Sequence, residues 1–258
     1  MDLKTCLLKL FLNNLETVSL ISLYLRSFIY TIIMFLSFII LCSAALIPPP
    51  LMSETRRWSI AVLWAEINIA ALKMICGLNY IVKGEENIPP HKCVVFFKHS
   101  SVMEAFVGLK HFSPSSWVAK YELMYAPLFR GAIKRFGLIP VKRGMGGSEV
   151  DKVVKTGKRR LLENKWIIIF PEGTRMPYKQ TKKYGLSGAI LAKGSGVDVL
   201  PISHNSGKYW KRRGLLKHPG TIIFSIGQPI KTKDKSVDNI NKEAQTWIES
   251  EIRAFDKE

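Results

Sequence analysis

The sequence is poor in acidic residues and in cysteine. Asp and Glu number 20 against 38 Lys and Arg, which gives a formal net charge of +18. The four cysteines form no Cys-x-x-Cys pair and no other metal-ligand spacing, so we expect free thiols in a reducing compartment and no metal site. With only 13 Pro and 18 Gly in 258 residues, collagen-like and low-complexity chains are excluded. A hydrophobic content of 47% excludes intrinsic disorder.

The excess of positive charge lies almost entirely in the second half of the chain. Residues 1–129 hold 11 basic and 8 acidic side chains, whereas residues 130–258 hold 27 and 12. A half-chain this basic favours a polyanionic partner: nucleic acid, an anionic membrane surface, an acidic protein or a phosphorylated substrate. The sequence contains no recognisable reading helix or base-stacking motif, so we expect no nucleic-acid partner.

A long uncharged run near the N-terminus indicates a membrane. Residues 27–47 carry no charge and would form about 31 Å of helix, close to the hydrocarbon thickness of a bilayer. A cleaved signal peptide fits poorly, because 26 residues precede a run that is longer than the usual apolar core of about 7–15 residues. A buried core helix of this length without charge would be rarer still.

A second apolar stretch, residues 58–79, predicts a partner helix. Glu66 and Lys73 interrupt it at a spacing that puts both on one helical face, which is typical of an interfacial helix. Arg56 and Arg57 beside it suit an anchor on the cytoplasmic face. We therefore predict that residues 1–79 form a membrane-embedded helical hairpin in a bacterial-type inner (cytoplasmic) membrane, with the rest of the chain on the cytoplasmic side. Whether the hairpin spans the bilayer or dips into one leaflet stays open.

Residues 80–258 read as one α/β domain, in which short β-branched or aromatic runs alternate with helical segments. The run Trp166–Phe170 is apolar throughout, which predicts burial on both faces and hence a mostly parallel, mixed sheet flanked by helices. We expect strands at 80–83, 93–98, 117–119, 139–141, 166–170, 199–202 and 221–226. We expect helices at 101–111, 122–136, 148–163, 186–193 and 237–255.

Two candidate site motifs follow predicted strands, where the chemistry of α/β sheets collects. His99 ends one strand and Glu104 follows five residues later, so the carboxylate could hold one ring nitrogen and leave the other as a base. The substrate would then supply the nucleophilic hydroxyl. The structural alternative is a half-buried histidine beside a capping box, Ser101-x-x-Glu104. On its own, the pair favours that alternative.

The second motif is the turn Phe170-Pro-Glu-Gly-Thr-Arg175. Gly173 allows backbone N–H groups to approach an anion, and Arg175 offers a fork of donors to phosphate oxygens. A surface turn with a solvated arginine is the alternative.

Together, four segments resemble, in order and spacing, the four blocks of the PlsC-type glycerolipid acyltransferases, and most closely the 1-acyl-sn-glycerol-3-phosphate acyltransferases. The segments are His99-x4-Glu104 and residues 139–144, 170–175 and 199–205. The resemblance extends over about residues 20–230. Glu104 stands where the family usually has Asp.

The resemblance implies an activity and a set of site residues. His99 would be the general base that takes the proton from the sn-2 hydroxyl of lysophosphatidate, and Glu104 would orient it. The acyl donor would be acyl-CoA or acyl carrier protein, the product phosphatidate, and no cofactor or metal would be needed. Pro201 would shape the acyl side. The residues implied in binding the glycerol phosphate are Lys120, Lys142, Arg143, Glu172, Gly173, Thr174 and Arg175.

Two alternatives remain open from the sequence. The acceptor could be another lysophospholipid or an ornithine lipid, because the four blocks do not separate these. The chain could also be a non-enzymatic membrane protein that binds anionic lipid through its basic face. The basic run 208–213 could be merely solvated, although attraction to lipid headgroups or an acidic carrier explains it better. His204 follows a predicted strand near the site, but the family pattern does not require it.

Overall fold

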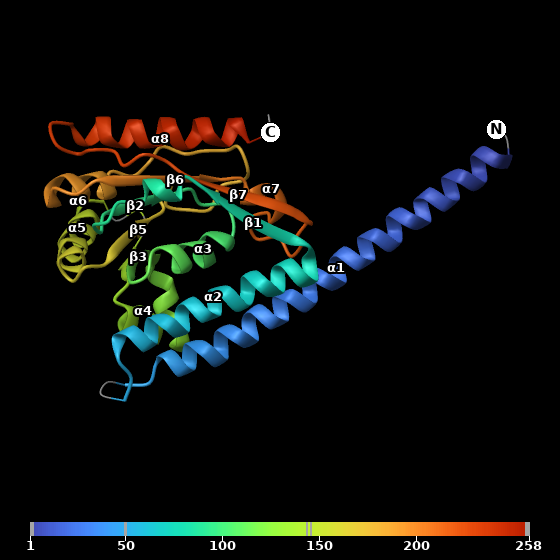
Figure 1. The fold of residues 1–258 in the computed structure, drawn as a ribbon, viewed down its shortest axis with the longest axis horizontal. Helices are drawn as coiled ribbons and strands as arrows, with labels where there is room; N and C mark the ends of the chain where they lie inside the picture. The colour runs from blue at the N-terminus through green and yellow to red at the C-terminus, as the bar shows by residue number, and fades with distance from the viewer. Residues whose placement is uncertain (1–2, 49–50, 143, 145, 256–258) are drawn as a thin grey trace.

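The computed structural model describes residues 3–48, 51–142, 144 and 146–255. A long helical hairpin lies against one face of a sheet whose other face is covered by further helices, and the N-terminal part of the first helix projects away from the rest (Figure 1). The predicted fold class is confirmed by this arrangement, a mixed sheet flanked by helices and preceded by two apolar helices.

The described residues form a sheet of seven strands in the order β1-β7-β6-β2-β5-β3-β4. All neighbouring strands pair in parallel except β6 and β7, which are antiparallel. The carboxyl ends of β2, β5, β6 and β3 therefore meet at one edge. The strands are β1 (Leu78–Lys83), β2 (Val94–Phe97), β3 (Ser115–Lys120), β4 (Ile139–Val141), β5 (Trp166–Ile169), β6 (Val199–His204) and β7 (Gly220–Ile226).

Alternation along the central strand β2 divides the core in two. Val95 and Phe97 face the hairpin side, whereas Val94 and Phe96 face the opposite side. All four side chains are fully buried, which explains why the strand is a continuous apolar run. The helix α3 (Met103–His111) lies on the hairpin side; the opposite face is covered by α5 (Gly147–Leu162), α6 (Ser187–Ser195) and α8 (Val237–Ala254).

The hairpin consists of α1 (Leu3–Ala45) and α2 (Glu54–Cys76). The Ser53 side chain accepts a hydrogen bond from Arg56 N at the start of α2, and Gly77, at φ 64°, ends the helix. Arg57 is buried and donates to Ala45 O (3.0 Å), so it ties the two helices together. Arg57 thus lies inside the hairpin, whereas Arg56 is exposed beside it, and an anchor at a membrane interface stays a prediction.

The hairpin and the sheet share one core. Trp64 of α2 packs edge-on against Phe106 of α3, with ring centroids 5.0 Å apart. At the other end of the hairpin, Lys217 donates to Ser27 O (3.3 Å) and its ammonium lies over the Tyr30 ring. The predicted division between residues 79 and 80 falls inside β1, two residues after its start.

The outer surface of the hairpin is apolar. The residues Val18–Ala45 and Glu54–Cys76 are each long and apolar enough to cross a bilayer. Such a large exposed apolar surface is rare on monomeric soluble proteins and indicates a membrane protein. The exposed apolar side chains of α1 include Ile21, Phe28, Ile32, Phe35, Leu36, Ile39 and Ile40.

The structure also tests the predicted helix 122–136 and the predicted state of the cysteines. The predicted helix 122–136 is divided into a 3-10 helix η2 (Tyr121–Tyr125) and α4 (Pro127–Phe136), because Pro127 suits the first turn of a helix and disfavours helix in the residue before it. Cys42, Cys76 and Cys93 are buried free thiols, as predicted; the side chain of Cys6 lies outside the described part of the structure. The one-turn helix α7 (Ser206–Tyr209) was not predicted.

Candidate active site

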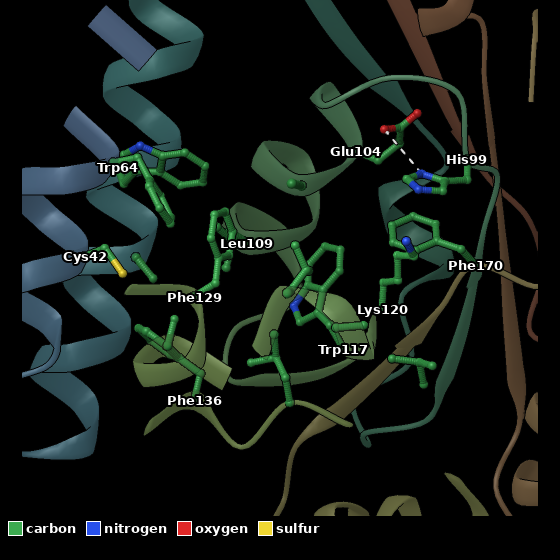
Figure 2. A pocket seen from close by; sticks show the side chains of 18 of the residues that line it. Cys42, Trp64, His99, Glu104, Leu109, Trp117, Lys120, Phe129, Phe136 and Phe170 are labelled. Atoms are coloured by element: carbon green, nitrogen blue, oxygen red, sulfur yellow. Dashed lines mark ion pairs between the residues drawn. The ribbon is translucent and has the colours of Figure 1, made fainter. Parts of the chain in front are cut away.

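A cavity of about 520 Å³ opens between the hairpin, α3, α4 and the carboxyl ends of β2, β3 and β5 (Figure 2). One end is lined by apolar side chains, with Cys42 from α1, Trp64 from α2, and Phe129 and Phe136 from α4. The other end, around His99 and Glu104, is polar, and the charged side chains of the lining, besides His99, are Glu104, Lys120, Arg175, Arg212 and Arg213. The cavity is therefore suited to a ligand that has one long apolar part and one anionic part.

His99 stands just beyond the end of β2, where the strand presents it to the cavity. Its ring stacks on Phe170, with centroids 3.9 Å apart and planes inclined by 20°. Its Nδ1 atom lies 3.9 Å from Glu104 Oε2 (Figure 2). Hydrogen bonds between catalytic side chains are often long without substrate and tighten when it binds. The pair has the geometry of a base and the carboxylate that orients it.

Glu104 lies in the first turn of α3 and is fully buried. Its Oε1 atom accepts hydrogen bonds from Ser100 N (2.8 Å) and Ser101 N (2.6 Å), and from Ser206 Oγ (3.2 Å). Its Oε2 atom faces His99. Each of the two interpretations of the sequence motif thus describes one oxygen of the carboxylate. Oε1 caps the helix start, and Oε2 faces the histidine.

Burial dominates the electrostatics of this carboxylate. It raises the pKa of Glu104 to about 7, against the opposing effects of the Ser101 and Ser100 N–H groups and of the Arg175 charge. The carboxyl group therefore exchanges its proton in the neutral range, where a general-base reaction has to work.

The turn after β5 brings Thr174 and Arg175 to the cavity. Gly173, at φ 68°, makes this turn possible, and Met176 N donates to His99 O (2.7 Å), which fixes the turn beside the histidine. The Arg175 Nε atom is buried and makes no hydrogen bond to any residue that the structure describes. An unsatisfied guanidinium donor at the polar end of the cavity is a candidate site for an anion.

The structure does not bring every predicted binding residue to this cavity. Glu172 is buried behind it, where its Oε1 atom accepts from Lys98 Nζ (2.6 Å). Pro201 packs beside Gly227, away from the cavity lining. The Lys142 ammonium lies over the Tyr121 ring. The exposed Gly173 shapes the turn without lining the cavity, and Arg143 lies outside the described residues.

Two lining residues were missed by the sequence reasoning. Arg212 and Arg213, from the segment after α7, line the cavity. The signal was present in the basic run 208–213, but nothing in the sequence places this segment at the cavity. Within the described ranges, no three His, Cys, Asp or Glu side chains converge in a way that could hold a metal ion.

Comparison with known proteins agrees with this fold. The chain resembles the crystal structure of the 1-acyl-sn-glycerophosphate (LPA) acyltransferase PlsC from Thermotoga maritima, with a TM-score of 0.74 over 92% of this chain and 98% of that one at 18% identity, so the two share a fold. A family model described as Acyltransferase matches residues 79–205.

Sequence relatives extend the comparison. The chain is 35% identical to a Pseudomonas aeruginosa 1-acyl-sn-glycerol-3-phosphate acyltransferase over 78% of this chain and 80% of that protein. It is 27% identical to the Saccharomyces cerevisiae protein of the same name, over 67% of this chain and 59% of the yeast protein. The chain belongs to the acyltransferase family, and the resemblance seen in the four sequence blocks is confirmed.

Proposed function

We propose that this protein transfers an acyl group from an acyl thioester to the sn-2 hydroxyl of 1-acyl-sn-glycerol-3-phosphate, which makes phosphatidate. The observation that supports this most is one cavity whose lining includes the His99–Glu104 pair, three arginines and a long apolar interior. Such a cavity fits a lipid that carries a phosphate near a free hydroxyl. The names of the relatives point to the same reaction.

The reaction follows from the polar end of the cavity. Neutral His99 takes the hydroxyl proton on the ring nitrogen that faces the substrate, while its Nδ1–H donates to Glu104 Oε2. The substrate oxygen attacks the thioester carbonyl carbon and forms the new C–O bond. As the tetrahedral intermediate collapses, the C–S bond breaks and His99 returns its proton to the departing thiolate. The Glu104 carboxylate stabilises the imidazolium that exists between these two steps.

The phosphate of the acceptor would be held by the cations at the same end. Arg175 offers its unsatisfied Nε–H, and Arg212 and Arg213 add positive charge to the lining of the same cavity. Thr174 and Lys120 line the cavity there as well, although Lys120 also pairs with Glu122 (3.2 Å). Phosphate contacts of Lys142, Arg143 and Gly173 stay predictions.

Glu172 and Pro201 do not line the cavity. We assign Glu172 the role of supporting Lys98 and the backbone of His99, whose N–H donates to Glu172 Oε2 (3.3 Å), in place of direct contact with substrate. An influence of Pro201 on the acyl side stays a prediction.

The hairpin would place the reaction at a membrane. In this proposal residues 1–79 anchor the enzyme and residues 80–258 carry the catalytic domain, on the cytoplasmic side of a bacterial-type inner membrane. Side chains of α1 and α2 line the apolar end of the cavity, so the anchor also forms part of the acyl-binding wall. Both reactants carry acyl chains, and this wall keeps them in an apolar medium.

The test is an assay of the purified protein in detergent micelles with lysophosphatidate and either acyl-CoA or acyl carrier protein thioester. We expect phosphatidate with at least one donor, and loss of it in His99→Ala. Other lysophospholipids and an ornithine lipid serve as comparison acceptors. Faster transfer to one of these would show that it, and not lysophosphatidate, is the acceptor. Full activity of His99→Ala would refute the proposed mechanism.

A further inference from the structure

A second histidine is buried behind Glu104, on the side away from His99. His204 ends β6, and none of its side chain is exposed. Its Nε2 atom is 2.8 Å from Lys98 O and 3.2 Å from Glu104 Oε1. Lys98 directly precedes His99 in the chain. One ring therefore touches both the backbone that carries the base and the carboxylate that orients it.

The hydrogen bonds around the ring assign its tautomer. Ser206 N–H donates to His204 Nδ1 (3.3 Å), so Nδ1 carries the lone pair and Nε2 carries the hydrogen. The Nε2–H group then donates to the Lys98 carbonyl and turns its positive edge toward Glu104 Oε1. Burial lowers the pKa of His204 to about 3, so the ring stays neutral throughout the working range of the enzyme.

Ser206 completes this support from the same segment of the chain. Its hydroxyl donates to Glu104 Oε1 (3.2 Å) and accepts a hydrogen bond from Ser101 Oγ (2.8 Å). The hydrogen bonds that the Glu104 side chain accepts, from Ser206 Oγ and from the N–H groups of Ser100 and Ser101, all end on Oε1, and Oε2 accepts none within the described residues. The end of β6 thus fixes one oxygen of the carboxylate and leaves the other directed at His99.

We propose that His204 is a positioning residue for acyl transfer: it joins the Lys98 carbonyl to Glu104 Oε1 and so keeps Oε2 turned toward His99. This inference rests on the proposed function. It assigns His204 no proton transfer and no contact with substrate, and His204 is not among the residues that line the cavity.

The experiment compares two substitutions of different chemistry. His204→Leu fills the space without a donor, whereas the amide of His204→Gln can still donate to Lys98 O. We expect His204→Leu to lower kcat about 10–100-fold with KM for lysophosphatidate changed less than about twofold. His204→Gln should recover kcat to within about fivefold of the original. His91→Leu, at a half-exposed histidine outside the cavity, is the matched control and should be unchanged.

A double substitution separates positioning from a general loss of stability. If His204 acts through Glu104, then Glu104→Gln with His204→Leu should be no slower than Glu104→Gln alone, within about twofold. Multiplied losses in the double variant, or His204→Leu with kcat within twofold of the original, would overturn the positioning role. A failure of His204→Gln to recover activity would overturn it as well.

Folding and the proposed function are checked in the same set. If His204→Leu does not fold, the decision rests on His204→Gln and Ser206→Ala; the latter should lower kcat about fivefold and show no added loss in the Glu104→Gln background, and an added loss would overturn the proposal. Normal turnover of Glu104→Gln would refute the roles of both Glu104 and His204. If Glu104→Gln is impaired and the double variant shows the product of the two single losses, only the role of His204 is refuted.

Discussion

Two buried polar clusters lie on opposite sides of the end of β2. One surrounds Lys98 and the other surrounds His99, the next residue in the chain. Lys98 points away from the cavity, and its three donors are all used, by Glu172 Oε1 (2.6 Å), Glu249 Oε1 (2.8 Å) and Gln180 O (2.9 Å). His99 points into the cavity. The cluster around it leaves Glu104 Oε2 and Arg175 Nε buried without hydrogen bonds within the described chain.

The comparison shows how burial serves two purposes in one fold. The Lys98 cluster is saturated, and it ties the end of β2 to the turn after β5 and to the C-terminal helix α8. The His99 cluster is also held from behind, through the hydrogen bonds of Glu104 Oε1, but on the cavity side it contains polar atoms without hydrogen bonds. Buried polar groups without partners are rare, and here they lie where a substrate would supply the partners.

The largest expected effect comes from His99→Ala, which breaks the cavity-side cluster. Removal of a general base should lower turnover about 10³-fold. The free energy of unfolding should change by less than about 1 kcal/mol, since the His99 ring lies at the cavity wall, where it stacks on Phe170. Steady-state kinetics and denaturant unfolding in detergent measure the two quantities. A fall in unfolding free energy large enough to explain the loss of turnover would mean that His99, like Lys98, mainly stabilises the fold.

Lys98→Met should show the opposite pattern. Removing the lysine leaves Glu172 and Glu249 buried together without their cation, and breaking a buried ion pair from one side destabilises a protein by about 3–5 kcal/mol. The expected result is a large fall in unfolding free energy, with the remaining folded protein still able to bind lysophosphatidate. Unfolding within about 1 kcal/mol of the original would contradict the assigned role of Lys98.

Glu104→Gln tests the carboxylate that belongs to the cavity side alone. The substitution keeps an oxygen for the Ser100 and Ser101 N–H groups but removes the charge that stabilises protonated His99. Turnover should fall well over tenfold, whereas KM for lysophosphatidate should change little. If turnover stays near normal, Glu104 has only its capping role.

The pH dependence of turnover should sharpen the comparison further. Burial raises the pKa of Glu104 to about 7, so kcat should fall as the pH drops through about 7 and the carboxylate gains its proton. A glutamate with the ordinary pKa of 4.5 would keep its charge through this range. A kcat profile that stays flat down to pH 5.5 would show that the reaction does not depend on the ionised form.

The smallest effect is expected at the apolar end. Ala61→Phe adds bulk to the α2 wall of the cavity and should reduce kcat/KM for long acyl chains about tenfold relative to short ones. Ser59→Phe, on the same helix but outside the lining, is the matched control. Equal losses for long and short chains would mean that this end does not hold an acyl chain.

Much of the fold was predictable because its signals are local. The strand ends at Phe97 and Ile169 follow short apolar runs, and parallel strands bring such ends to one edge, which is why His99 and Arg175 were expected to meet. The contrast between Lys98 and His99 was not predictable. Adjacent residues leave a strand on opposite sides, but which side is the cavity depends on where the hairpin packs.

The remaining gaps have the same long-range origin. Glu172 sits in the most specific of the four blocks, yet its partners are Lys98 and, through Lys98, Glu249, which lie far away in the sequence. Arg212 and Arg213 reach the cavity only because α7 turns the chain after β6. His204 gains its contacts to Lys98 and Glu104 from the pairing of β6 with β2, which no local pattern specifies.

The apolar wall formed by α1 is one helix thick. Phe35 and Ile39 are exposed on its outer side, while Phe38 and Cys42 line the cavity on its inner side. A hydrocarbon tail that left lipid through water would lose about 0.8 kcal/mol for each methylene, or roughly 12 kcal/mol for a sixteen-carbon chain. If α1 lies in a bilayer as proposed, a tail that passes around this helix into the cavity exchanges one apolar environment for another, and its transfer to the catalytic residues is nearly isoenergetic.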